Sequence, residues 1–323
     1  MKITALVCSL SFLLTLFSPA QPPKSFKTID LNKAKIAGST CQINLQDGLS
    51  SVIWLDEQHL VASSFSARCS SAPSIPPAAA EAVVFDITGS VQATDRRSGT
   101  MFFSKGPRGT IAALGSGEIE LLDAQLHRQQ TIECPNSSKG CGITLAPNST
   151  FDSEFAVCST IDQQEQVCDF YSGWPAVTFR QAKSQPENPY SHLVNSGLHT
   201  SWQVASGETW FFNNGRLTAS DANKVFSPVS SEDFVGKEGG GCDGHLSEVE
   251  PRRFLAVCTG THWYSDGMFD AIFGFSRVVL FDVSTRSVIK RIDGPAYVSA
   301  SLSPSGKRVA ILKGGKVRLY EAD

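Results

Sequence analysis

Three features are scarce in this sequence, and each absence excludes a class of protein. Charged residues make up only 18% of the chain, and the 28 Lys or Arg nearly balance the 31 Asp or Glu, so the formal net charge is −3. That balance gives no overall electrostatic footprint for nucleic acid or anionic lipid. Beyond the N-terminal region, no run is long and apolar enough for a membrane-spanning helix. Helical periodicity is absent from the clearest part of the chain, which argues against a helical domain.

Motifs for catalysis and for cofactors are also missing. The sequence contains no G-x-S-x-G elbow, no H-E-x-x-H helix, no phosphate-binding loop and no EF-hand pattern. It contains no C-x-x-C pair, which argues against a zinc site or a thioredoxin-type redox centre. The sequence therefore predicts no cofactor and no metal.

The N-terminus has the three parts of a secretory signal peptide. Lys2 supplies the positive charge, Ile3 to Phe17 form the apolar region, and Ser18-Pro19-Ala20 is a small-residue cleavage site. We therefore expect residues 1–20 to be removed after Ala20. Residues 21–323 are then expected to form a single domain that is secreted or periplasmic.

What the sequence does contain is a repeat of short apolar runs separated by turn residues, seen best from Arg277 to Asp323. The predicted second strands align at intervals of 44 to 54 residues, at Ala62, Ala112, Ala156, Trp210, Ala256 and Ala310. A four-stranded unit with this period is typical of a propeller blade. We predict an all-β chain that forms a six-bladed β-propeller, with seven blades as the alternative. In the second unit, GTIAALG and EIELLDA (Gly109 to Ala124) are expected to form the inner pair.

The last predicted unit has one strand too few. Ser25 to Leu31, near the N-terminus, alternates like a strand but has no partner nearby in the sequence. Pairing this N-terminal strand with the last unit would complete the C-terminal blade, close the ring and remove an exposed sheet edge.

The last two units carry a family resemblance. LSPSGKRVAIL followed by GKVRLYE, together with RVVLFDVSTRSVIKRI, resembles the repeats of WD-repeat (WD40-like) and YVTN-like β-propellers, here in a secreted form. The Trp-Asp dipeptide of WD repeats is absent, and the one Gly-His pair, Gly244-His245, does not recur between units. Propellers serve many unrelated roles, so the resemblance implies a fold and no particular function.

Eight cysteines remain after the predicted leader, which itself contains Cys8. An even set in an exported protein favours disulfides: Cys41, Cys69, Cys134, Cys141, Cys158, Cys168, Cys242 and Cys258. Equivalence between the third and fifth units favours the pairs Cys141–Cys158 and Cys242–Cys258, leaving Cys41–Cys69 and Cys134–Cys168. A sequential scheme with Cys134–Cys141 and Cys158–Cys168 is the alternative.

Four aspartates recur at the ends of third strands, at Asp86, Asp123, Asp221 and Asp282. Their recurrence favours a structural role, because an Asp at the mouth of a hairpin accepts hydrogen bonds from the amides of the turn. A catalytic ring is the less favoured interpretation.

Long connections gather on one side of the predicted propeller. In this topology the connections between second and third strands, and those from a last strand into the next unit, emerge on the same face, which we call the loop-rich face. Its long segments are Ser64 to Glu81, Cys134 to Gly140, Ala182 to Leu198, Ser230 to Gly241 and Thr261 to Ser276. Long loops on a rigid scaffold commonly carry binding sites, so this face is the predicted binding surface.

Polar and aromatic residues concentrate in the fifth unit on that face. The candidate binding surface comprises Asp243, His245, His262, Trp263, Tyr264 and Asp266. One hypothesis is a metal or ligand site that uses both histidines and an Asp, although no fixed ligand spacing supports it. The alternatives are aromatic side chains that pack over the edge of the blade, or Trp263 and Tyr264 as anchors for a partner.

These observations favour a non-catalytic scaffold that binds a protein or a glycan partner through the loop-rich face. We expect a monomer that binds no nucleic acid and does not span a membrane. The alternative is a propeller-type enzyme, a hydrolase or a cyclase, with polar residues at the central funnel. A third possibility is a structural domain whose channel is plugged.

Overall fold

The computed structural model describes residues 24–35, 45, 50–65, 79–135, 141–145, 154–162, 165–172, 178–180, 199–203, 209–213, 216–221, 224–226, 240–247, 253–265, 270–295 and 298–322. The predicted signal peptide lies outside these ranges. Apart from the short 3-10 helix η2 (Pro107–Gly109), the regular elements within them are β-strands. None of the helices in these ranges is long and apolar enough to cross a membrane.

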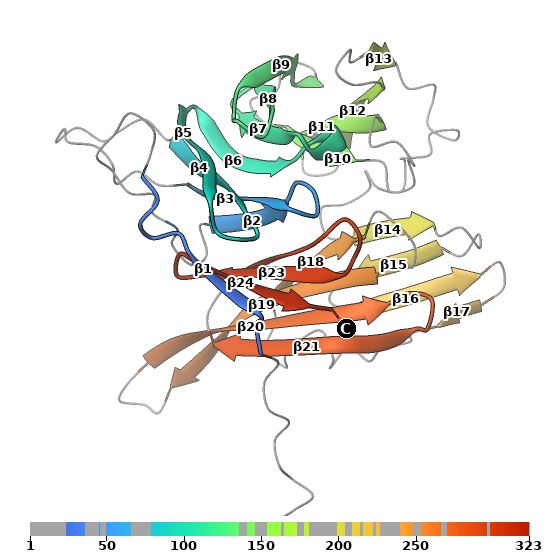
Figure 1. Ribbon diagram of the computed structural model, residues 1–323. Helices are drawn as coiled ribbons and strands as arrows, with labels where there is room; N and C mark the ends of the chain where they lie inside the picture. The colour runs from blue at the N-terminus through green and yellow to red at the C-terminus, as the bar shows by residue number, and fades with distance from the viewer. Residues whose placement is uncertain are drawn as a thin grey trace, which may run out of the picture.

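The strands form six four-stranded antiparallel sheets in this part of the chain (Figure 1). The first sheet consists of β2 (Ser50–Trp54), β3 (His59–Phe65), β4 (Ala79–Asp86) and β5 (Val91–Ser98). The second consists of β6 (Thr100–Lys105), β7 (Ile111–Gly115), β8 (Glu118–Leu122) and β9 (Arg128–Glu133). The third consists of β10 (Gly142–Leu145), β11 (Glu154–Asp162), β12 (Glu165–Ser172) and β13 (Thr178–Arg180).

The remaining sheets come from the second half of the chain and its N-terminal strand. The fourth consists of β14 (His199–Gln203), β15 (Thr209–Asn213), β16 (Arg216–Asp221) and β17 (Lys224–Phe226). The fifth consists of β18 (Gly240–Leu246), β19 (Arg253–Ser265), β20 (Asp270–Asp282) and β21 (Ser287–Pro295). The sixth consists of β22 (Ser299–Leu302), β23 (Arg308–Lys313), β24 (Lys316–Glu321) and β1 (Lys27–Asp30). The chain is therefore all-β with a propeller-like fold.

The aligned residues of the repeat, five of which are alanine, occupy one structural position. All six aligned residues lie in the second strand of their sheet, as predicted. Ala62, Ala112, Ala256 and Ala310 have no exposed surface. Ala62 and Ala310 belong to the core between the first and sixth sheets, and Ala112 to the core between the second and third. A small side chain here lets neighbouring sheets approach closely, which explains why the position repeats.

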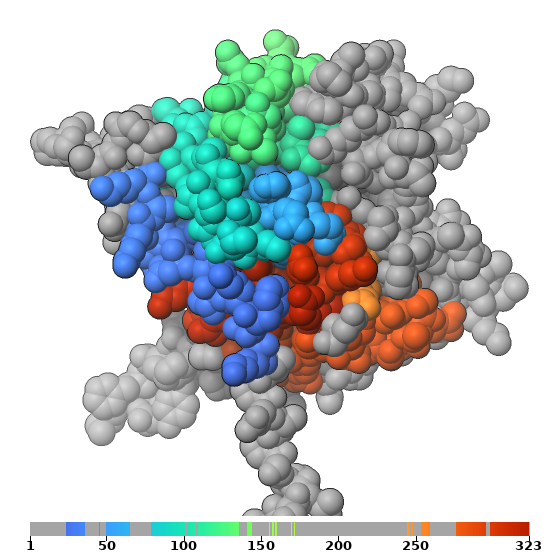
Figure 2. Space-filling view, in the orientation of Figure 1, coloured from blue at the N-terminus to red at the C-terminus, as the bar shows by residue number. Residues whose placement is uncertain are grey.

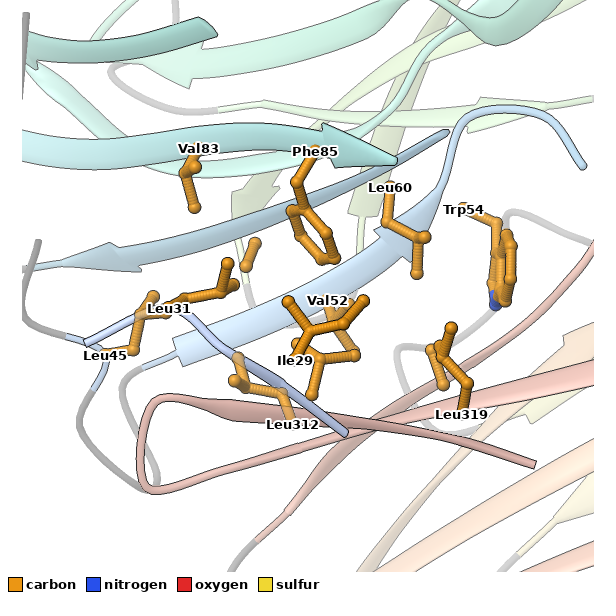
Figure 3. Close-up of a cluster of buried hydrophobic side chains, with 13 residues drawn as sticks. Ile29, Leu31, Leu45, Val52, Trp54, Leu60, Val83, Phe85, Leu312 and Leu319 are labelled. Atoms are coloured by element: carbon orange, nitrogen blue, oxygen red, sulfur yellow. The ribbon is translucent and has the colours of Figure 1, made fainter. Parts of the chain in front are cut away.

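Neighbouring sheets share apolar cores. Separate clusters join the fifth sheet to the sixth, the sixth to the first, the first to the second and the second to the third. The cluster between the sixth and first sheets brings the two ends of the chain together, with Ile29 and Leu319 packed near Val52 and Trp54 (Figure 3). Five of the sheets therefore pack in series, and the series crosses from the C-terminal sheet to the N-terminal one.

The expected partner of the N-terminal strand is present. β1 pairs antiparallel with β24, from Lys27 opposite Leu319 to Asp30 opposite Lys316. Beyond the strand, Leu31 N donates to Gly315 O at 2.9 Å, and the Asn32 side-chain amide donates to Gly314 O at 3.2 Å. β1 thus completes the sheet that β22, β23 and β24 begin.

Hydrogen bonds between sheets reinforce the meeting of the two chain ends. Ser301 Oγ accepts from Trp54 N at 3.4 Å, and Ser301 O accepts from Trp54 Nε1 at 3.2 Å. The turn after β22 contacts both neighbours, because Ser305 N donates to Glu57 Oε1 at 2.6 Å and Gly306 O accepts from Arg253 Nη1 at 3.1 Å. The sixth sheet is therefore tied to the first sheet on one side and to the fifth on the other.

Two details differ from the sequence-based expectation. The innermost strand of the second sheet is β6, so GTIAALG and EIELLDA supply its second and third strands and are not the inner pair. Thr261 to Ser276 is not a loop, because β19 and β20 continue through most of it in regular antiparallel register. The residues Thr261–Ser265 and Asp270–Gly274 extend past the pairing of β18 and β21 and form a two-stranded ribbon.

Candidate functional site

A cavity of about 330 Å³ lies at the junction of the first and second sheets. One wall is the connection from β5 to β6, and the other is the turn from β7 to β8 with the strands beside it. Both connections belong to the loop-rich face by their topology. The lining residues are Arg97, Ser98, Gly99, Thr100, Ala113, Gly115, Ser116, Glu118 and Glu120.

The walls of the cavity follow from the local sequence. β8 alternates, so that Ile119 and Leu121 are buried while Glu118 and Glu120 reach the cavity side. Gly99 has φ +82° and links β5 directly to β6, a backbone conformation that residues with a Cβ rarely adopt. The tight connection therefore brings the end of β5 over the start of the second sheet.

An ion-pair network fixes the charged wall of the cavity. Arg97 Nη1 donates to Glu120 Oε2, Arg97 Nη2 donates to Leu126 O at 2.6 Å, and Arg97 Nε lies 2.8 Å from Asp95 Oδ2. Glu120 Oε1 also accepts from Arg128 Nη1 at 3.3 Å. The side chains of Arg97 and Glu120 are only 18% and 17% exposed, so both are held in place and partly shielded from water.

The arginine preceding this network is neutralised separately. Arg96 faces Glu81 across the β4–β5 ladder, with Nε 4.0 Å from Oε1. The Glu81 side chain is 1% exposed, and Ser64 lies opposite it on β3. A buried carboxylate requires such a partner, because an isolated charge in the interior is costly. Both arginines of the Arg96-Arg97 pair are thus held by acids at the same end of the first sheet.

The structure separates the two histidines of the sequence-predicted site. Asp243 and His245 lie on β18, whereas His262, Trp263 and Tyr264 lie on β19, and Asp266 falls outside the described residues. His245 is paired with Leu255, seven residues before His262 on the same strand, which places the two histidine backbones roughly 23 Å apart. The hypothesis that His245 and His262 share a metal ion is therefore wrong. Across the ranges that the structure describes, no group of three or more His, Cys, Asp or Glu could hold a metal ion.

Trp263 and Tyr264 lie in the two-stranded ribbon. Trp263 is paired with Ile272, and Tyr264 with Ala271. Because the ribbon extends beyond both neighbouring strands, its pairing within the described residues comes from its own two strands alone.

The charged cavity was not predicted from the sequence. Its signals were the Arg96-Arg97 pair shortly before Gly99 and the Glu-x-Glu pattern after a Gly-Ser-Gly turn.

The four long segments of the loop-rich face other than Thr261 to Ser276 lie mainly outside the described residues.

The disulfide found in the structure follows the sequential scheme. Cys134 and Cys141 are bonded, with their Cα atoms 5.6 Å apart, and they clip the connection from β9 to β10. The pair Cys141–Cys158, which repeat equivalence favoured, and the pair Cys134–Cys168, which that scheme left over, are therefore wrong. The residue opposite Cys158 on β10 is Gly142, whereas Cys242 lies directly opposite Cys258. Cys141 is thus one residue out of step with Cys242, and such a shift turns a side chain to the other face of the strand.

The other cysteines agree with this scheme as far as they are described. Cys158 and Cys168 are cross-strand partners on β11 and β12. Cys258 is disulfide-bonded, and its cross-strand partner on β18 is Cys242. Cys41 and Cys69 fall outside the described residues.

The recurrent aspartates act as turn caps, as predicted, wherever their side chains are described. Asp86 Oδ1 accepts from Thr88 N and Ser90 N, and Asp123 Oδ1 accepts from two turn amides in the same way. Asp282 Oδ1 accepts from two amides of its own turn. The side chain of Asp221 is not among those described. These caps lie at the opposite end of the sheets from the loop-rich face.

The shifted pKa values fit this structural role. The hydroxyl of Thr88 and the turn amides lower the pKa of Asp86. Partial burial alone would raise the pKa of Asp282, but hydrogen bonds from Ser284 and Thr285 outweigh it and lower that pKa. Burial raises the pKa of Tyr171, whose ring stacks on Phe155 with the centroids 5.2 Å apart. None of these groups lines the cavity.

Comparisons with known proteins give likenesses of fold only. The sequence matches no protein-family model and no curated protein. A crystal structure of a DUF4221-family member from Bacteroides vulgatus has a TM-score of 0.48 and 10% identity, over 92% of this chain and 96% of that one. The Pan2 WD40 domain of Neurospora crassa has 0.42 and 10%, over 86% and 89%. The AfRom2 CNH domain has 0.41 and 9%, over 92% and 99%.

The last two repeats predicted a propeller-like fold, and the four-stranded sheets of the chain are propeller-like. All three TM-scores are below 0.5. The propeller-like fold is therefore inferred from the four-stranded sheets of this chain and not from these likenesses.

Proposed function

We propose that this protein is an exported, non-catalytic binding scaffold that recognises a protein or glycan partner through its loop-rich face. The observation that carries the proposal is the cavity between the first and second sheets, which opens on that face. Its volume is at the lower end of the range of small-ligand sites, about 300 to 1,000 Å³, so it suits one group of a larger partner.

The chemistry of the cavity favours a polar group without negative charge. The charge of Arg97 is already paired with Asp95 and Glu120, whereas the exposed Glu118 carboxylate in the lining makes no ion pair within the described residues. Ser98, Ser116 and Thr100 add hydroxyls that donate and accept. A sugar residue or a polar peptide side chain fits such a lining.

The scaffold is a closed six-bladed propeller in this proposal. Support comes from the pairing of β1 with β24 and from the cores that link five sheets in series across the chain ends. A closed ring leaves no sheet unpacked on either face, and it holds the loop-rich face rigid for binding.

Export of a single domain spanning residues 21–323 completes the proposal. The apolar leader and the Cys134–Cys141 disulfide support it, because structural disulfides persist mainly in oxidising compartments. Secretion or periplasmic location is tested by N-terminal sequencing of the exported protein, which should begin at Gln21.

Blocking the cavity tests the binding function. Labelled protein is applied to arrays of glycans and peptides, alongside S98W, which places a large side chain at the exposed rim of the cavity. The control is Q125W, which places the same side chain in an exposed turn at the opposite end of the second sheet. We expect wild type and Q125W to bind the same array members and S98W to lose them. Binding by S98W equal to wild type, or none by wild type, would overturn the proposal.

The enzyme alternative makes a different demand on the structure. A hydrolase or cyclase needs titratable side chains that converge on the substrate, with pKa values matched to proton transfer. The lowered pKa values of Asp56, Asp86 and Asp282 belong to carboxylates that cap turns. No observation on the described residues therefore favours catalysis over binding.

A further inference from the structure

The small net charge of the chain conceals an uneven distribution. Residues 24–35 and 298–322, which build the sixth sheet, contain nine Lys or Arg and two Asp or Glu, a formal charge of +7. Because the whole chain has a charge of −3, the remainder has a charge of −10. A third of the cations thus lie in one sheet, beside almost none of the acids.

Most of these cations are exposed and unpaired. Arg308 pairs with Glu321 at 3.4 Å, and Lys313 has an interaction of its own. The other seven are exposed and make no side-chain hydrogen bond or ion pair within the described part of the chain: Lys24, Lys27, Lys33, Lys35, Lys307, Lys316 and Arg318. We call these seven residues the basic edge.

The basic edge runs along the outermost strand of its sheet. Lys24, Lys27, Lys33 and Lys35 belong to β1 or flank it, and β1 pairs on one side only, with β24. Lys307 lies in the turn at one end of β23, whereas Lys316 follows the turn at its other end, roughly 20 Å away. Figure 2 shows the segment around β1, in blue, on the surface of the molecule that faces the viewer.

We propose that the basic edge binds a linear acidic polysaccharide, whose carboxylates or sulfates contact the lysines in succession. Within the described residues these seven cations form no ion pair, so an anionic partner gains attraction without first breaking one. Phe26 lies within the edge, 48% exposed, with the Arg308 guanidinium 6.0 Å from its ring centroid. The exposed ring surface offers apolar contact for the hydrophobic face of a sugar.

The layout of the cations favours a flexible polymer over a flat bilayer. They occur at both ends of β23 and along the strand edge between, so a chain can follow them in sequence. A bilayer would meet only those that reach one plane. Protection of an edge strand by lysine is common, but Lys307, Lys316 and Arg318 lie outside the edge strand β1 and are not explained by it.

The site is separate from the cavity between the first and second sheets. Its cations come from the sixth sheet and from β1, and none of them lines the cavity. Loss of one kind of binding without the other therefore distinguishes the two proposals.

The test measures binding of fluorescein-labelled polygalacturonate by fluorescence anisotropy. The variant K316Q/R318Q removes two cations of the basic edge. The control R286Q/R291Q removes two exposed arginines of the fifth sheet, which lie outside both the cavity and the basic edge, and makes the same change in net charge. We expect K316Q/R318Q to bind about tenfold or more weakly, at about fivefold per cation, and the control to bind as wild type. The salt dependence of the affinity should also become shallower in K316Q/R318Q alone.

Several outcomes would overturn the proposal. If both variants bind polygalacturonate equally weakly, only the net charge of the protein matters. If neutral dextran binds as tightly as polygalacturonate, the anionic groups of the polymer do not contribute to binding. Binding of vesicles containing anionic phospholipid, or of a single-stranded DNA 30-mer, in preference to polygalacturonate would assign the surface to another partner. Self-association of wild type that K316Q/R318Q abolishes, measured by light scattering, would assign it to a second copy of this chain.

Discussion

The attachment of β1 can be tested at a single glycine. Gly314 and Gly315 form the turn between β23 and β24, with φ +55° and +69°. A Cβ on Gly314 would meet nothing within 4 Å, whereas a Cβ on Gly315 would overlap the side-chain amide of Asn32, with Cγ only 2.6 Å away. Asn32 lies just beyond β1, which ends at Asp30, so G315A disturbs the attachment of the N-terminal strand and G314A does not.

The magnitude follows from these contacts. Each substitution places a side chain in the left-handed region at a cost of about 1 to 2 kcal/mol. G315A must also displace the Asn32 amide, which donates to Gly314 O at 3.2 Å, and the loss of one such hydrogen bond costs about 0.5 to 1.5 kcal/mol. We therefore expect G315A to be less stable than G314A by roughly 1 kcal/mol. In an N32A background the overlap is absent, and this difference should disappear.

Urea unfolding, followed by circular dichroism, gives the free energy of unfolding of G314A and G315A, of the same two substitutions in the N32A background, and of N32A alone. Limited proteolysis provides a second measurement, because a detached β1 exposes cleavage sites before residue 36. Equal stability of G314A and G315A would refute the reasoning, as would a difference that persists in the N32A background. Either result would mean that Asn32 does not hold the N-terminal strand on this turn.

Three further predictions concern the core, the turn caps and the disulfides. W54A should lower the free energy of unfolding by about 3 to 5 kcal/mol in urea titrations, since Trp54 is 1% exposed between the first and sixth sheets. Hydrogen bonds hold the pKa of Asp86 and Asp282 below 3.8 in the folded protein, so the stability they confer is complete above that value and is lost as the pH falls through the folded pKa. Unfolding free energy should therefore decline below about pH 4, and less steeply in D282N. Peptide mapping without reduction should recover the Cys134–Cys141 link, with Cys158–Cys168 and Cys242–Cys258; a Cys141–Cys158 link would contradict the structure.

The strand order could be predicted because the repeat carries its own constraints. Alanine recurs where two sheets approach most closely, and aspartate recurs where a turn presents free amides. Both positions are set within one unit, so one sequence is enough to find them. The unpaired strand around Ile29 could be found for a related reason, since its alternation required a partner that nothing nearby supplied.

Features that depend on contacts between units could not be predicted. The cavity arises where β5 leads into β6 against the β7–β8 turn, and only the packing of two sheets places Arg97 beside Glu120. The pairing of Cys141 depended on a one-residue register that repeat equivalence does not determine. The ribbon at Trp263 lies where other units have connections, so its position in the repeat predicts a loop, although its residues favour strands.

The basic edge and the completion of the sixth sheet depend on the same strand, so they should be coupled. Four of the seven cations of the basic edge lie in β1 or next to it in the sequence. They are held in place only while β1 is paired with β24. A polyanion that binds better when β1 is paired with β24 than when β1 is detached must stabilise that pairing, by an amount that grows with the ratio of its concentration to its dissociation constant. Polygalacturonate should therefore raise the urea midpoint of wild type and slow proteolysis before residue 36, and high salt should cancel both effects. If the polymer binds without protecting the N-terminal strand, the cations of β24 and of the β22–β23 turn are sufficient, and β1 serves only to complete the sixth sheet.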